Sequence, residues 1–201
     1  MARDVCGGCG RLTSVCICGA LVEVQSPLRV VILQHPSELK QALATVPLLQ
    51  RCLTPCEVHV GEDFNGTEIQ ARLQAQAAGV ALLFPESEVA APADRSDFTP
   101  HTLLAIDGTW RKARRILHTN PWLLELPRLS LSDAYASRYR IRQSSVPGSL
   151  STLEAVAFGL FQVSGDNAML ELMRPFEAMV DMQIKKMGAE VFRAHYQKQM
   201  D

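Results

Sequence analysis

Four cysteines lie within thirteen residues near the N-terminus, at Cys6, Cys9, Cys16 and Cys18. Glycines between and beside them let the backbone curl around a tetrahedral centre. Four thiolates suit zinc, and no histidine or glutamate in this stretch could activate a water, so we predict a structural zinc site. The short Cys-x-Cys pair leaves two alternatives open: an iron–sulfur cluster, or three cysteines completed by an outside ligand.

A second group of candidate residues, Asp107-Gly108-Thr109-Trp110, follows an apolar run and precedes a helical pattern. In a parallel sheet, catalytic and ligand-binding side chains gather where strands end. Gly108 permits a sharp turn at this point. A purely structural role is also open, with Thr109 capping the helix and Trp110 packing in the core.

Two further segments carry polar side chains that could belong to a site. His35 and Glu38 follow the first apolar run, although a histidine before proline also suits a simple turn. Ser151 and Glu154 fit the Ser-x-x-Glu capping box, so their structural role would be to begin a helix.

Basic residues are concentrated in one part of a chain whose net charge is −1. Between residues 107 and 142, eight Lys and Arg face three Asp and Glu, a local charge of about +5. Arg138, Arg140 and Arg142 alternate, so an extended segment would present all three to RNA phosphates on one face. A second group that could contact RNA consists of Arg111, Arg114 and Arg115. A helix would spread these side chains over more than one face, so a solvated helix surface is the alternative to RNA contact.

The elements that must position these residues alternate between strands and helices. Apolar runs predict strands at residues 30–33, 56–60, 80–84, 102–106 and 128–131. Helical patterns cover residues 37–50, 67–78, 110–118, 151–163 and 167–187, and Pro47 should end or kink the first near Val46. We therefore predict a zinc module at residues 1–24 and an α/β domain at residues 25–201. Its sheet should be mostly parallel and flanked by helices.

Several classes of protein are disfavoured. No stretch approaches the roughly 18 uncharged apolar residues that span a bilayer. The apolar region of a secretory signal does not follow the basic residue Arg3, so we expect no such signal. We expect a cytoplasmic protein with no membrane association and no obligate protein partner. P-loop, dinucleotide-binding glycine and serine-nucleophile motifs are missing, which gives no support to kinase, dehydrogenase or hydrolase activity.

The motifs together resemble the DTW-domain family of tRNA-uridine aminocarboxypropyltransferases, which is named after an Asp-x-Thr-Trp motif. Asp107, Thr109 and Trp110 match it. The resemblance also includes the four cysteines, the segment Gln-His-Pro-Ser-Glu at residues 34–38 and Leu-Ser-Thr-Leu-Glu-Ala at residues 150–155. It covers nearly the whole chain, and four short motifs in the expected order are more specific than any one of them.

The resemblance implies a SPOUT-like fold whose C-terminal part forms a trefoil knot and binds S-adenosylmethionine in its loops. It implies transfer of the 3-amino-3-carboxypropyl group to N3 of a uridine in the tRNA variable loop, with release of methylthioadenosine. Asp107 would be the general base, or an electrostatic anchor for the cofactor or substrate. The expected cofactor-binding residues are Asp107, Gly108, Thr109, Trp110, Ser151, Thr152, Glu154 and His35.

Two other functions remain open at this point. An S-adenosylmethionine-dependent RNA methyltransferase could use the same fold, because local sequence does not show which sulfonium carbon faces the acceptor. A zinc-containing RNA-binding protein without catalysis would explain the cysteines and the basic segment, but not Asp-Gly-Thr-Trp.

Overall fold

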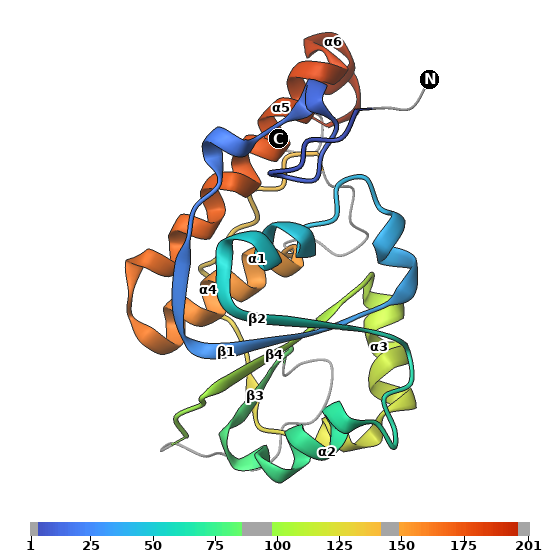
Figure 1. The fold of residues 1–201 in the computed structure, drawn as a ribbon, viewed down its shortest axis with the longest axis vertical. Helices are drawn as coiled ribbons and strands as arrows, with labels where there is room; N and C mark the ends of the chain where they lie inside the picture. The colour runs from blue at the N-terminus through green and yellow to red at the C-terminus, as the bar shows by residue number, and fades with distance from the viewer. Residues whose placement is uncertain (1–3, 86–97, 142–148, 197–201) are drawn as a thin grey trace.

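A five-stranded parallel sheet forms the centre of the protein (Figure 1). The computed structural model describes residues 4–85, 98–141 and 149–196. The strands are β1 (Val24–Gln34), β2 (Leu53–Val60), β3 (Val80–Leu83), β4 (Thr102–Asp107) and β5 (Arg128–Leu129). Their order is β2-β1-β4-β3-β5, and each neighbouring pair is parallel. The predicted α/β class with a parallel sheet is confirmed.

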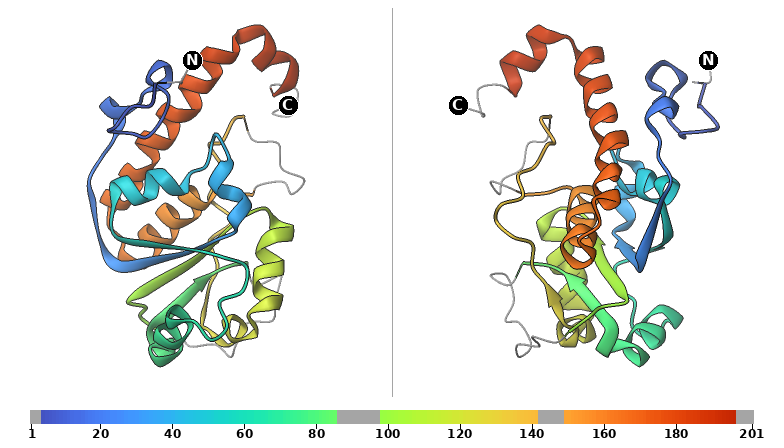
Figure 2. Two further views of the ribbon diagram at one scale, coloured as in Figure 1. Left: turned by 45° about the vertical axis from the view of Figure 1, so that its right-hand side comes forward. Right: turned by 90° about the vertical axis from the view of Figure 1, so that its left-hand side faces the viewer.

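Helices cover both faces of this sheet (Figures 1 and 2). One face carries α1 (Val46–Cys52), α4 (Thr152–Ser164) and α5 (Met173–Met187). The other face carries α2 (Glu68–Ala75) and α3 (Trp110–Thr119). Along β1, Val30 and Ile32 belong to the first core, while Val31 and Leu33 belong to the second. Burial on both faces explains why this run is continuously apolar.

Helix α4 lies close against the sheet because it contains a glycine at the contact. A Cβ atom at Gly159 would lie 3.3 Å from Leu83 Cδ1 and 3.4 Å from Leu103 Cδ2. The predicted capping box begins this helix: the Ser151 hydroxyl accepts a hydrogen bond from the Glu154 N–H, and the Glu154 carboxylate accepts one from the Ser151 N–H. The position of α4 at the centre of one layer brings its first turn to the carboxyl end of the sheet.

The helix predicted at residues 37–50 is wrong. A short 3-10 helix, η3 (Pro36–Lys40), is followed by nonhelical residues, and α1 begins only at Val46. Pro47 lies in the first turn of α1, where its fixed φ suits a helix and its missing N–H leaves no hydrogen bond unmade. Proline therefore starts this helix rather than ending it. The helix predicted at residues 167–187 is likewise divided, into the 3-10 helix η7 (Asn167–Leu172) and α5.

The cysteine-rich N-terminal segment lies beside α5, which extends beyond the sheet and is followed by α6 (Ala189–His195) (Figures 1 and 2). Cys9 and Ile17 are buried in the core that α1, α4 and α5 share. Arg51 of α1 donates a hydrogen bond to the Gly8 carbonyl (2.5 Å), and Arg174 of α5 donates one to the Gly19 carbonyl (3.3 Å). The boundary at residue 24 between a zinc module and an α/β domain stays a prediction.

Among the described helices, none combines the length and apolarity that crossing a bilayer requires.

Candidate functional site

The Asp107 carboxylate joins three elements at the carboxyl end of the sheet. Asp107 ends β4, and its Oδ2 accepts a hydrogen bond from Gln34 Nε2 at the end of β1 (2.9 Å). Its Oδ1 accepts a hydrogen bond from the Thr152 hydroxyl in the first turn of α4. The sheet register places Gln34 directly beside Asp107. Asp107 is only 8% exposed, and its carboxylate is held between β1 and α4.

The turn after Asp107 is compact, and it leaves Thr109 exposed while Trp110 packs against another ring. A Cβ atom at Gly108 would lie 3.0 Å from the Lys112 Cβ, so glycine suits this close approach. Thr109 occupies the N-cap position of α3, but its exposed side chain makes no capping hydrogen bond. Trp110 packs edge-on against Phe84, with 5.7 Å between ring centroids, and also lines a pocket. The core and site roles of Trp110 are therefore compatible.

That pocket has a volume of about 550 Å³, within the usual range for small-molecule sites. It lies where β3, β4 and β5 end and where α4 begins. It brings together Gly108, Trp110, Ser151 and Thr152, which the sequence singled out. Its other lining residues are Leu83, Phe84, Pro85, Ile106, Ala113, residues 129–133, Tyr135, Ser149, Leu150 and Ala155. Of the described residues that line the pocket, Asp133 is the one with a charged side chain.

Glu154 lies outside this lining and is fully buried. Besides capping α4, its carboxylate accepts hydrogen bonds from the Ser137 hydroxyl (3.1 Å) and the Arg138 N–H (2.6 Å). It therefore holds the segment before α4 against the first turn of that helix. This geometry supports a structural role for Glu154 instead of contact with a cofactor.

We expect Glu154→Ala to lower the free energy of unfolding by about 3 kcal/mol, because several buried donors would lose their shared acceptor. Urea unfolding followed by circular dichroism measures this difference. The exposed Glu125 provides a control, and Glu125→Ala should stay within about 0.5 kcal/mol of the unchanged protein. Equal stability of the two variants would contradict the structural role.

His35 also lies outside the pocket lining. Its Nδ1 accepts a hydrogen bond from the Ser37 N–H (3.2 Å), and its Nε2 lies 2.9 Å from Glu62 Oε1. Glu62 also pairs with Arg115 of α3 (2.7 Å). His35 thus caps the turn that follows β1, as the turn interpretation predicted, and Glu62 connects it to α3. Its role in cofactor binding stays a prediction.

The arginines that the sequence suggested for RNA occupy two places. Arg111, Arg114 and Arg115 line a shallow depression of about 450 Å³ on the outer side of α3, together with His118 and Thr119. Arg138 and Arg140 both face α5, where they pair with Glu177 (2.5 Å) and Asp181. Arg142 lies outside the described residues. Both groups contain arginines with acidic partners, because Arg115 pairs with Glu62 (2.7 Å).

The four N-terminal cysteines meet as the spacing predicted. Their Sγ atoms all lie within 4.8 Å of one another, with 3.5 Å between Cys6 and Cys18 and 3.8 Å between Cys9 and Cys16. Hydrogen bonds to its sulfur, foremost from the backbone at Cys9, lower the pKa of Cys6 to about 6. A Cβ atom at Gly8 would lie 2.6 Å from Cys18 Sγ, so glycine is needed beside the cluster. The four sulfurs can hold one metal ion.

Sequence reasoning overlooked residues that the structure places at the site. Gln34 belonged to a noted motif but was given no role, although it ends a buried strand beside Asp107. Phe84 directly follows β3 and lines the pocket, and Tyr135 lines it while stacking on Phe158 (4.5 Å between centroids). The rule that ligands bind where parallel strands end could have indicated Gln34 and Phe84. No local signal marked Tyr135.

Comparison with known proteins identifies relatives over most of the chain. Residues 3–184 match the family model described as "DTW domain". The chain is 34% identical to tRNA-uridine aminocarboxypropyltransferase 2 of Mus musculus, over 94% of this chain and 66% of that protein. It is also 34% identical to the enzyme of that name from Drosophila melanogaster, over 94% of this chain and 78% of that protein.

A more distant relative is tRNA-uridine aminocarboxypropyltransferase A of Arabidopsis thaliana, with 26% identity over 91% of this chain and 82% of that protein. The chain thus spans about two thirds of the length of the mouse relative. No solved structure matches the chain.

Proposed function

Because the chain belongs to the DTW-domain family, we propose that it is a tRNA-uridine aminocarboxypropyltransferase. It would transfer the 3-amino-3-carboxypropyl group of S-adenosylmethionine to N3 of a tRNA uridine and release methylthioadenosine. The observation that carries this proposal is the pocket that the Asp-Gly-Thr-Trp turn and the first turn of α4 build together at the carboxyl end of the sheet. The names of the relatives support the reaction and the tRNA substrate.

The pocket suits S-adenosylmethionine in size and chemistry. Leu83, Phe84 and Trp110 provide apolar and aromatic surface, which suits adenine and can also face a cationic sulfonium. Asp133 offers a negative charge to the positively charged parts of the cofactor. The hydroxyls of Ser151 and Thr152 lie at the start of α4 and can hydrogen-bond polar atoms.

The sulfonium of S-adenosylmethionine supplies an activated carbon and a neutral leaving group. The protein must place that carbon in line with uridine N3 and accept the N3 proton as attack begins. Asp107 is the residue to which we assign the largest contribution. Its hydrogen bonds support a positioning role, because the carboxylate fixes Thr152, which lines the pocket. The role of general base requires, in addition, that the N3 proton reach one of these oxygens.

The outer face of α3 is the proposed contact for tRNA phosphates. Arg111, Arg114 and Arg115 lie together there, directly after the turn that lines the pocket. A helix carrying several arginines on one exposed side offers charge to a phosphate backbone near the reacting base. Arg138 and Arg140 would have to exchange their carboxylate partners on α5 for phosphate, as Arg115 would exchange Glu62. We place the main phosphate contact on α3 because this helix directly follows the turn that lines the pocket.

We propose that the cysteine cluster holds a structural zinc ion. A tetrahedral site with Zn–S bonds of about 2.3 Å has sulfurs about 3.8 Å apart, close to the separations within the cluster. Such spacing supports one metal ion rather than the larger iron–sulfur clusters that the sequence left open.

Reduced thiolates and a tRNA substrate both suit the cytoplasm, which is the location that we propose. The C-terminal trefoil knot and the variable-loop uridine stay predictions from the resemblance.

Mass spectrometry of nucleosides tests the proposed reaction. Unmodified tRNA is incubated with the purified protein and S-adenosylmethionine, and the adenosine by-product is followed in the same reaction. We expect a uridine with the added mass of the aminocarboxypropyl group and an equal amount of methylthioadenosine. A methylated base with S-adenosylhomocysteine would instead establish a methyltransferase, and failure to bind S-adenosylmethionine would favour the noncatalytic RNA-binding protein.

A further inference from the structure

Arg128 is a partly buried arginine whose guanidinium nitrogens are all buried. It begins β5 at one edge of the sheet, and none of the three nitrogens has a hydrogen-bond partner in the part of the chain that the structure describes. Within residues 4–85, 98–141 and 149–196, it forms no salt bridge. An arginine offers five N–H donors and remains charged, so this arrangement costs stability. Buried polar groups that are left unpaired in native proteins call for a functional explanation.

The guanidinium lies next to the proposed cofactor pocket. Its Cζ atom lies over the Phe84 ring, 6.0 Å from the centroid, and Phe84 lines the pocket and contacts Trp110. The two residues after Arg128, Leu129 and Ser130, also line the pocket. Arg128 itself is not among the lining residues, so contact with an anion in the pocket requires its side chain to turn toward the pocket.

We propose that Arg128 binds the carboxylate of the aminocarboxypropyl group of S-adenosylmethionine, an inference that rests on the proposed function. An α-carboxylate is ionised at neutral pH, and its two oxygens match the planar fork of a guanidinium. Pairing would satisfy donors that are otherwise buried and unpaired. Asp133, also at the pocket, is available to the amino group of the same cofactor.

This contact would also help to select the reaction. A carboxylate held by Arg128 fixes the end of the chain that is to be transferred, and so restricts which carbon of the sulfonium can lie in line with the acceptor. Arg128 would therefore act on both cofactor affinity and the choice of transferred group.

Calorimetric titration with three ligands tests the assignment. The ligands are S-adenosylmethionine, decarboxylated S-adenosylmethionine and methylthioadenosine, and the variants are Arg128→Met and Arg128→Lys. We expect Arg128→Met to bind S-adenosylmethionine about 10- to 100-fold more weakly, as for loss of one charged hydrogen-bonded partner. Its affinity for the two ligands without a carboxylate should stay within about 2-fold. The affinity of Arg128→Lys for S-adenosylmethionine should lie between those of the unchanged protein and Arg128→Met, because lysine keeps the positive charge but not the planar fork.

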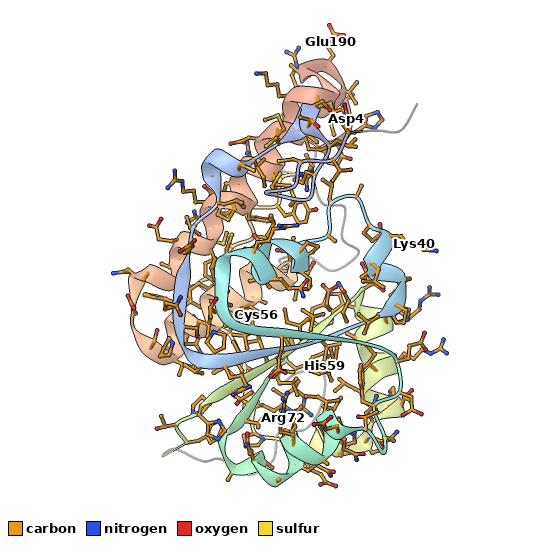
Figure 3. The ribbon with its side chains drawn as sticks, in the orientation of Figure 1. Asp4, Lys40, Cys56, His59, Arg72 and Glu190 are labelled. Atoms are coloured by element: carbon orange, nitrogen blue, oxygen red, sulfur yellow. The ribbon has the colours of Figure 1, made fainter. Side chains whose placement is uncertain are left out.

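A matched arginine and a stability measurement serve as controls. Arg72 of α2, labelled in Figure 3, pairs with Glu57 on the opposite edge strand β2 (2.7 Å), and Arg72→Met should leave all three affinities unchanged. The Arg128→Met protein without ligand should melt at or above the temperature of the unchanged protein, since it no longer buries unpaired donors. A purely structural Arg128 would instead lower the melting temperature when it is replaced.

Several results would overturn the assignment. Equal weakening of all three ligands would mean that Arg128 only shapes the pocket. Unchanged affinity for S-adenosylmethionine, with weaker binding of tRNA, would assign the guanidinium to a phosphate. If the unchanged protein bound the cofactor through Arg128 but produced a methylated base, the proposed reaction would fail and the carboxylate contact would stand. If the unchanged protein did not bind the cofactor at all, both the proposed reaction and the carboxylate contact would be refuted.

Discussion

Asp107→Ala is expected to lower the single-turnover rate of aminocarboxypropyl transfer by at least about 100-fold while leaving the fold intact. The carboxylate holds the end of β1 and the first turn of α4 at the pocket, so its removal disturbs positioning as well as any proton transfer. The measurement is product formation with excess enzyme and saturating S-adenosylmethionine, with circular dichroism as the test of folding. Full activity in this variant would remove Asp107 from the mechanism.

A pH series and a second variant separate the two roles of Asp107. If Asp107 is the base, the residual rate of Asp107→Ala should rise steeply with pH, because hydroxide replaces the missing acceptor of the N3 proton. If Asp107 acts by positioning, Thr152→Val should reproduce much of the loss, since it removes the hydroxyl donor at nearly constant volume. In that case both variants should also bind S-adenosylmethionine more weakly. A large effect of Asp107→Ala with none for Thr152→Val would favour the base.

Metal analysis of the purified protein should find one zinc ion per chain, and Cys9→Ser should lose it. Cys9 is buried in the core shared with α1 and α5, so loss of the metal should unfold the N-terminal segment and lower the melting temperature. Structural zinc sites in small domains contribute about 10–16 kcal/mol of apparent binding free energy, so the effect should be large. Zinc content by atomic spectroscopy and thermal unfolding provide the two measurements.

Cys56→Ser is the matched control for this prediction. Cys56 lies on β2, where Figure 3 labels it, and does not belong to the cluster. Its replacement should leave the zinc content unchanged. S-adenosylmethionine affinity should change little in Cys9→Ser, because the pocket lining includes none of the four cysteines. Iron with visible absorbance in the purified protein would overturn the zinc assignment. Retention of zinc by Cys9→Ser would support a site of three cysteines that an outside ligand completes.

The sequence by itself determined the features that depend on neighbouring residues. The apolar runs of β1 and β4 indicated strands buried on both faces, since no polar side chain interrupts them. The spacing of Cys6, Cys9, Cys16 and Cys18 indicated a metal site because the four thiols are joined by a short, glycine-rich chain. The capping box at Ser151 and Glu154 is equally local, and the structure confirms it.

Only the tertiary structure decided which distant residues meet and what their polar atoms bind. Gln34 reaches Asp107 because β1 and β4 pair in a register that places the two side by side, 73 residues apart in the chain. Glu154 serves the preceding segment as well as its own helix, and Arg138 finds Glu177 on α5. Such contacts depend on strand register and on the packing of helices across the sheet. Nearest-neighbour patterns carry no information on either, because both arise from burying surfaces that are far apart in the sequence.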